Sequence, residues 1–141
     1  MKTKHVMAVV AGISLLSWAP LLAHHSVAGE FDPNKPVTVT GTVTKVEWVN
    51  PHSRVRFDVV GADGTVTNWS VELAARVVLE RMGWNGRSLK IGDKIKVTGD
   101  QARSGAPMMN ARGRELEAIR QGGPKEYPIT RDDGTPLLYE R

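Results

Sequence analysis

Apolar and polar residues alternate along several short stretches of the chain, which is the pattern of strands that bury one face. The alternation runs from Val37 to Val43, resumes from Val55 to Val59 and continues from Val66 to Leu73. The last two stretches are separated by Ala62-Asp63-Gly64, which is typical of a hairpin turn. Three antiparallel strands in a meander are therefore predicted.

The first of these strands is predicted to be long and bent. Val46 and Trp48 have the opposite parity from the apolar residues before them. Such a slip in phase beside Gly41 indicates a bulge or a coil. Asn50-Pro51-His52 then supplies the turn that leads into the second strand.

The second half of the chain begins with a change of period. Between Ala74 and Trp84 the apolar residues recur at helical spacing, and Gly83 is suited to end the helix. Lys94 to Gly99 alternates again and predicts a fourth strand. A polar loop is expected from Gln101 to Pro107, followed by a fifth strand with weaker alternation from Met108 to Glu117.

Three strands, a helix and two further strands follow the order of a small, mainly β, five-stranded OB-like barrel with one helix between strands 3 and 4. The competing arrangement is an open antiparallel sheet with one helix on its face. The 141 residues leave room for one such domain, predicted over residues 24–120 with an N-terminal arm. Glycine and proline residues predict a tail over residues 121–141.

Residues 1–23 have the features of a secretory signal peptide. A short basic start precedes an apolar run from Val6 to Leu16, and Ala23 supplies the small residue before the cut. Cleavage there makes His24 the first mature residue, and cleavage after Ala28 is the alternative. We expect export to the periplasm and no stable membrane insertion afterwards, because a membrane span needs about 20 apolar residues.

Charge narrows the range of partners. Cleavage removes Lys2 and Lys4 and no acid, which leaves 17 basic and 15 acidic residues and a net charge of +2. Because the acids are interspersed among the bases, we expect no nucleic-acid partner. The nearest approach to a basic patch consists of four arginines: Arg54, Arg56, Arg112 and Arg114.

The histidines carry the most specific chemistry. The chain has no cysteine, which excludes a disulfide framework, a thiolate metal site and a cysteine nucleophile. Cleavage after Ala23 would place an α-amine beside the imidazole of His24, and such nitrogen donors suit Cu(II). His25 and the turn residue His52 could add further nitrogens if the N-terminal segment folds back. Copper is therefore the candidate metal, and its binding should weaken in acid because a free α-amine has a pKa of about 7.7 to 8.0.

The metal hypothesis has a structural alternative. The two N-terminal histidines could belong to an exposed segment, and His52 could be hydrogen-bonded to nearby backbone. Trp48 and Asn50 lie next to the histidine turn and are predicted to contribute to ligand binding, whereas Trp69 and Trp84 are predicted to fill the core. Surface solvation is the expected role of three acids in the strands: Glu47, Asp58 and Glu72.

Motifs along the mature chain also occur together in a known family. The matching residues are His24-His25-Ser26, Phe31-Asp32, Gly41-Thr42-Val43, Val46, Trp48, Asn50-Pro51-His52, Asn68-Trp69, Glu72-Leu73, Gly83-Trp84, Leu89, Gly92-Asp93, Val97 and Gly99. In this order and spacing they resemble the domain of unknown function 6152 family of small exported bacterial proteins, over roughly residues 24 to 118. The resemblance implies export and this fold but no mechanism. Ala74-Ala75-Arg76 departs from the family pattern, in which a Ser-Pro-Asn-like helix start is more usual.

These observations predict a periplasmic, non-enzymatic module that binds a small ligand, with copper as the specific candidate. The alternative is a structural or envelope-stress accessory protein that docks on an envelope protein partner and has no metal role. A copper-dependent oxidoreductase is a third interpretation, which would need an open metal position and a substrate surface. The sequence contains neither a glycine-rich phosphate loop nor a nucleophile elbow.

Overall fold

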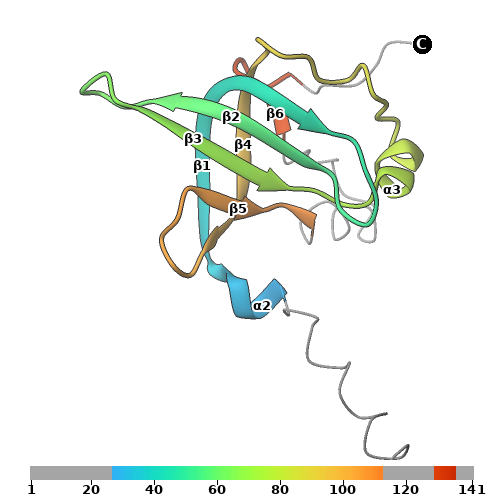
Figure 1. The fold of residues 1–141 in the computed structure, drawn as a ribbon, viewed down its shortest axis with the longest axis horizontal. Coiled ribbons are helices and arrows are strands. Elements are labelled where there is room, and N and C mark those ends of the chain that lie inside the picture. The colour runs from blue at the N-terminus through green and yellow to red at the C-terminus, as the bar shows by residue number, and fades with distance from the viewer. Residues whose placement is uncertain (1–26, 113–128, 136–141) are drawn as a thin grey trace, which may run out of the picture.

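The fold is seen in a computed structural model that describes residues 27–112 and 129–135. Its elements in chain order are α2 (Val27–Glu30), β1 (Phe31–Glu47), β2 (Arg54–Val60), β3 (Val66–Glu72), α3 (Arg76–Arg81), β4 (Lys94–Ala102), β5 (Met108–Asn110) and β6 (Ile129–Arg131). Five strands close into a barrel in the order β1-β2-β3-β5-β4, and β4 pairs back with β1 (Figure 1). This order, with β3 parallel to β5, is that of an OB-fold. The predicted five-stranded barrel is confirmed.

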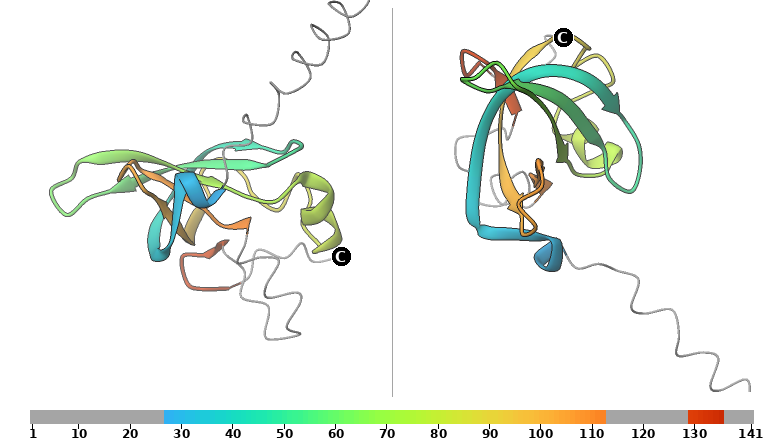
Figure 2. Two further views of the ribbon diagram at one scale, coloured as in Figure 1. Left: turned by 90° about the horizontal axis from the view of Figure 1, so that it is seen from below. Right: turned by 60° about the vertical axis from the view of Figure 1, so that its left-hand side comes forward.

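β1 closes the barrel because it changes partner along its length. Its first half pairs with β4 and its second half pairs with β2. The register of the β1–β2 pair shifts between Val43 and Lys45. This irregularity lies slightly beyond Gly41, beside which the sequence predicted a bulge. Gly41 instead permits a close approach, since a Cβ there would lie 2.5 Å from the carbonyl oxygen of Asp58. The resulting bend of β1 around the barrel is visible in Figure 2.

The β2–β3 hairpin turns at the predicted Ala62-Asp63-Gly64. Gly64 has a φ of 80°, a conformation that glycine adopts without strain. The hairpin projects beyond the barrel, and its paired residues Val60 and Val66 are exposed (Figure 1).

α3 lies between the third and fourth strands, as predicted, but it is shorter than the apolar pattern suggests. Ala74 still belongs to the end of the sheet, because its carbonyl oxygen accepts a hydrogen bond from the N–H of Ser53 at 3.1 Å. The helix ends before Gly83, whose φ of 92° allows the chain to turn away. In the part of the chain that the structure describes, no helix is long and apolar enough to cross a membrane.

β4 continues beyond its predicted end. Ala102 pairs with Phe31 at the start of β1, so the expected polar loop begins later than Gln101. β5 covers Met108–Asn110, and its predicted continuation to Glu117 lies outside the described residues.

β6 is a short strand within the region predicted as a tail. It pairs antiparallel with β4, where Ile129 lies opposite Val97 and Arg131 lies opposite Ile95. β5 pairs with a later part of β4, at Asp100 and Gln101, so the two short strands divide β4 between them. This segment therefore extends the sheet.

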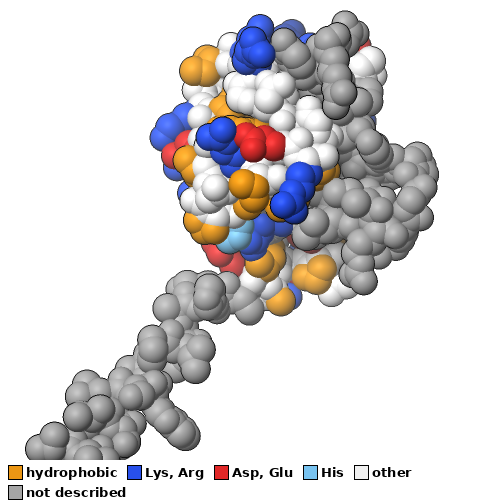
Figure 3. Space-filling model, turned by 90° about the vertical axis from the view of Figure 1, so that its right-hand side faces the viewer, with side chains coloured by type: hydrophobic (Ala, Val, Ile, Leu, Met, Phe, Trp, Pro, Cys, Tyr) orange, Lys and Arg blue, Asp and Glu red, His pale blue; other side chains and the backbone are white. Residues whose placement is uncertain are grey.

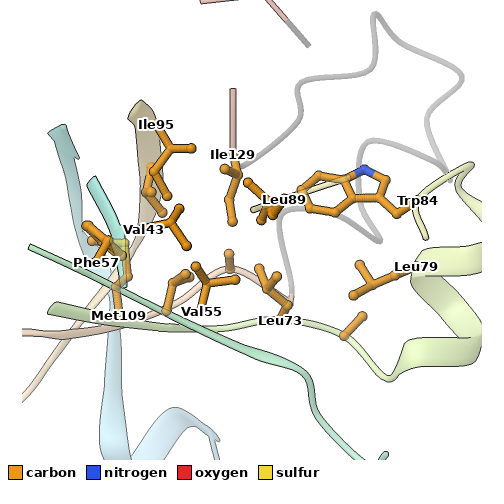
Figure 4. Close-up of a cluster of buried hydrophobic side chains, with 14 residues drawn as sticks. Val43, Val55, Phe57, Leu73, Leu79, Trp84, Leu89, Ile95, Met109 and Ile129 are labelled. Carbon is orange, nitrogen blue, oxygen red and sulfur yellow. The ribbon is translucent and has the colours of Figure 1, made fainter. Parts of the chain in front are cut away.

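The hydrophobic core fills the barrel and continues toward α3 (Figure 4). Its buried members are Val43, Val55, Phe57, Val71, Leu73, Ala74, Leu79, Trp84, Leu89, Ile95, Val97, Met109, Ala111 and Ile129. Trp84 is buried above Leu79, and Trp69 packs partly buried against the cluster. Both tryptophans thus contribute to the core.

Candidate functional site

The loop between β1 and β2 is fastened to the end of β3. The N–H of Ser53 donates to the carbonyl of Ala74 at 3.1 Å, and the carbonyl of Ser53 accepts from the N–H of Leu73 at 2.8 Å. Its hydroxyl donates to the carbonyl of Val49 at 3.2 Å. Ser53 is fully buried, so these bonds hold the exposed Asn50-Pro51-His52 turn against the barrel.

Glu72, the last residue of β3, lies at the centre of a group of basic side chains. Its Oε1 is 3.4 Å from Nδ1 of His52 and 3.3 Å from Nε of Arg112, and its Oε2 is 3.4 Å from Nη2 of Arg54. The side chain of Glu72 is 16% exposed, whereas those of His52 and Arg54 are 39% and 40% exposed. We call these four residues the Glu72 cluster. Figure 3 shows the histidine at the surface beside basic side chains.

Parallel pairing of β3 and β5 brings Arg112 to Glu72. Glu72 is the register partner of Asn110, and its carbonyl accepts a hydrogen bond from the N–H of Ala111 at 2.9 Å. Oδ1 of Asn110 in turn accepts from the N–H of Arg112 at 2.9 Å. Because parallel strands end at the same edge, the residues that follow β5, Ala111 and Arg112, lie beside the last residue of β3.

Both ring nitrogens of His52 have partners. Nδ1 faces the carboxylate of Glu72, and Nε2 is hydrogen-bonded to Nη1 of Arg112. A guanidinium can only donate, so Nε2 accepts and the ring proton belongs on Nδ1. In this tautomer the ring N–H is directed at the carboxylate of Glu72. A metal ion at Nε2 would have to displace Arg112.

A second carboxylate, Glu47 at the end of β1, lies beside the Glu72 cluster. Its Oε1 accepts a hydrogen bond from Nζ of Lys45 at 2.9 Å, and its Oε2 is 3.8 Å from Nε of Arg56. The pKa of Glu47 is lowered, chiefly by the hydrogen bond from Lys45, with the positive charges of Lys45, Arg56 and Arg54 acting in the same direction. Both carboxylates thus face mainly basic groups.

The predicted metal ligands are only partly described. His24 and His25 lie outside the described residues, and His52 is the third predicted ligand. Within residues 27–112 and 129–135, no group of three His, Cys, Asp or Glu side chains could hold a metal ion. The contribution of the two N-terminal histidines stays a prediction.

The other two predicted ligand residues have different surroundings. The ring of Trp48 stacks on Trp84, with ring centroids 6.5 Å apart and planes 7° apart. Neither indole Nε1 has a hydrogen-bond partner in the described part of the chain. Asn50 is exposed in the turn. Trp48 is thus partly buried against the core, and its ring helps to anchor the loop that carries His52.

Sequence analysis missed the central position of Glu72 and its contact with Arg112. Glu72 follows the buried residue Val71 in an alternating strand, so its outward direction could be expected from parity. Its position beside the His52 turn requires knowledge of how the meander folds. No local pattern indicates Arg112, because its place depends on the parallel pairing of β3 and β5.

Comparison with known proteins identifies the family. The model of a family of unknown function, DUF6152, matches residues 11–111. The chain belongs to this family. The resemblance seen in the motifs is thereby confirmed, and membership of DUF6152 brings no assigned activity. No curated protein matches the chain.

Solved structures are similar to the DUF6152 barrel at low identity. The dimeric structure of the N-terminal domain of PriB protein from Thermoanaerobacter tencongensis is 18% identical, with a TM-score of 0.36, and the match covers 54% of this chain and 90% of that chain. Rim1, a mitochondrial single-stranded DNA-binding protein from S. cerevisiae, is 10% identical, with a TM-score of 0.37, and the match covers 57% of this chain and 88% of that chain. These likenesses concern the fold.

The prediction that excluded nucleic acid as a partner is wrong. The solved structures similar in fold include a single-stranded DNA-binding protein, so the fold gives no ground for this exclusion. The exclusion relied on charge averaged along the chain, whereas the potential at one face depends on the side chains gathered there. In the folded barrel, Arg54 and Arg56 share one face of β2.

Proposed function

We propose that this DUF6152 protein is an exported, non-enzymatic binding module that takes Cu(II) through His52 and the mature N-terminus. The observation that carries the proposal is the arrangement of His52. Its ring is 39% exposed, and its Nδ1 lies 3.4 Å from a largely buried carboxylate of Glu72. Histidines that bind metals commonly donate their second ring N–H to a carboxylate, which fixes the tautomer and the orientation of the ring.

Displacement of Arg112 is compatible with this role. When Nε2 of His52 turns to a metal, Arg112 loses its bond to the ring but keeps the carboxylate of Glu72, which lies 3.3 Å from its Nε. The guanidinium therefore retains an anionic partner. Arg112 would act as an internal competitor that lowers the affinity of His52 for the metal.

The other nitrogen ligands proposed for the copper ion are those that the sequence predicts at the mature N-terminus. Cleavage after Ala23 would present the α-amine and the imidazole of His24 together, with His25 adjacent. Amine and imidazole nitrogens match the preference of Cu(II), which stands at the top of the divalent affinity order. Both kinds of donor must be deprotonated, so we expect copper to be released in acid.

Native mass spectrometry of the protein secreted through its own leader tests the proposal. The spectrum is recorded before and after one equivalent of Cu(II), so that it gives the N-terminus and the metal count together. We expect a chain that begins at His24 and retains one copper through buffer exchange. His52→Ala should release the copper, whereas Val49→Ala, at an exposed position of the same loop, should retain it.

Two further variants test the roles of the neighbours. Glu72→Gln should weaken copper binding by about tenfold, the lower end of the effect of second-sphere partners on metal affinity. Arg112→Gln should strengthen binding, because it removes the competing hydrogen-bond donor. A chain that begins at Gly29, or one that begins at His24 and sheds copper freely, would overturn the proposal.

The alternative function is docking on an envelope protein partner. It is favoured by the exposed Val60 and Val66, which are 67% and 58% exposed at the tip of the projecting hairpin. His52→Ala separates the two functions, because a docking protein would keep its activity in the cell after this change. Loss of activity from Val60→Ser with Val66→Ser, but not from His52→Ala, would favour docking over copper binding.

A further inference from the structure

The outer face of β1, β2 and β3 carries more basic groups than acidic ones. Cross-strand register arranges six side chains there in two rows: Glu47, Arg54 and Glu72 in one, and Lys45, Arg56 and Ser70 in the other. Val55 and Phe57 alternate with the two arginines of β2 and point into the core, which fixes the outward direction of Arg54 and Arg56.

Charge on this face is not balanced by its own carboxylates. Among the described residues of the two rows and the Glu72 cluster, four are cationic: Lys45, Arg54, Arg56 and Arg112. Two are carboxylates, Glu47 and Glu72, and a third carboxylate, Asp58, is the next outward residue of β2 after Arg56. The face therefore has an excess of one positive charge with His52 counted as neutral. Glu47 and Glu72 each lie near more than one basic group.

The carboxylates beside Arg54 and Arg56 use only part of the N–H donors of the two guanidinium groups. Their side chains are 40% and 44% exposed and leave β2 on the same side, about 7 Å apart along the strand. Arg56 is 3.8 Å from Glu47, which is longer than a hydrogen bond, and Arg54 is 3.4 Å from Glu72. A guanidinium offers five N–H donors in a planar fork, so most of these donors face solvent.

We propose that Arg54 and Arg56 bind a phosphate oxyanion. A carboxylate ligand has two oxygens, and one guanidinium can donate hydrogen bonds to both of them. A tetrahedral phosphate has enough oxygens to accept hydrogen bonds from two guanidinium groups at once. The net positive charge of the face favours an anionic ligand, and Ser70, which carries a hydroxyl, lies opposite Arg56 in the register. Inorganic phosphate and the phosphate of an anionic lipid headgroup share this chemistry. The site uses no histidine and does not depend on copper.

Titration of the exported chain with inorganic phosphate tests the site. Amide resonances in ¹H–¹⁵N spectra are followed at constant ionic strength, with sodium chloride as the balancing salt. We expect saturable shifts in β1, β2 and β3, and Arg54→Gln with Arg56→Gln should weaken binding at least about tenfold. The matched control is Lys94→Gln with Lys96→Gln on β4, which removes the same charge at the same spacing and should leave the affinity within about twofold.

One variant should gain affinity. Glu47→Gln removes the carboxylate that competes for Arg56, so phosphate binding should tighten about threefold. Thermal unfolding of each variant shows that it is folded. Equal affinity in wild type and the double arginine variant would overturn the proposal, and so would equal weakening by the two double variants, which would mean only a general effect of charge.

Vesicles distinguish the two sources of phosphate. Co-sedimentation is measured with phosphatidylglycerol vesicles and with phosphatidylcholine vesicles. Sedimentation with phosphatidylglycerol alone, lost in the double arginine variant, supports a lipid headgroup as ligand. Saturable binding of inorganic phosphate without sedimentation supports a free phosphate, and absence of both overturns the site.

Discussion

Replacement of Ile129 by alanine tests whether β6 is part of the core. Ile129 comes from a region whose composition predicts a tail, yet its side chain is fully buried in the core cluster, and the residue lies opposite Val97 in the sheet (Figure 4). Truncation of a buried isoleucine removes apolar contacts and leaves a cavity, which together cost about 2 to 5 kcal/mol. β6 is short and lies at the end of the described chain, so local relaxation should keep the cost at about 2 to 3 kcal/mol.

The expected loss is large enough to measure in two ways. For a domain of this size, 1 kcal/mol lowers the melting temperature by about 4 to 8 °C, so Ile129→Ala should lower it by roughly 8 °C or more. Urea unfolding followed by tryptophan fluorescence should show a lower midpoint with an unchanged m value. Ile91→Ala is the matched control, because the same atoms are removed from a side chain that is 74% exposed.

We expect the control to change the free energy of unfolding by no more than about 0.5 kcal/mol. Equal effects from Ile129→Ala and Ile91→Ala would refute the reasoning, because they would show that β6 does not contribute to the core. A fall in the m value of Ile129→Ala would instead indicate that β6 detaches without unfolding the barrel.

Two further predictions concern the bend of β1 and the charge beside it. Gly41→Ala should destabilise the barrel by about 1 to 3 kcal/mol in urea unfolding, since its Cβ would meet the backbone of Asp58, whereas Gly86→Ala, with open space around it, should have little effect. The pKa of Glu47 is lowered in the folded protein, chiefly by the hydrogen bond from Lys45. The ionised carboxylate therefore stabilises the fold fully at pH values above the ordinary glutamate pKa of about 4.3. This stabilisation is lost as the pH falls through the lowered pKa of the folded protein. Melting temperatures of wild type and Glu47→Gln should therefore converge in acid; a constant difference would contradict this assignment.

Local patterns were sufficient to predict the architecture. Alternation of apolar residues predicted the barrel strands because a strand with one buried face repeats every two residues, whatever its partners are. The turn at Gly64 and the end of α3 at Gly83 followed from conformations that glycine readily adopts. Motif order also indicated the family, which the match over residues 11–111 confirms.

Contacts between distant segments depended on the tertiary structure. Arg112 contacts Glu72 only because β3 and β5 run parallel and end at the same edge of the sheet. The spacing of residues along the chain does not indicate that these two strands pair. Ile129 enters the core because part of β4 is left free by the short β5. The expectation of no nucleic-acid partner was drawn from charges along the chain. The charge of one face is instead set by which strands bring Arg54 and Arg56 beside their neighbours.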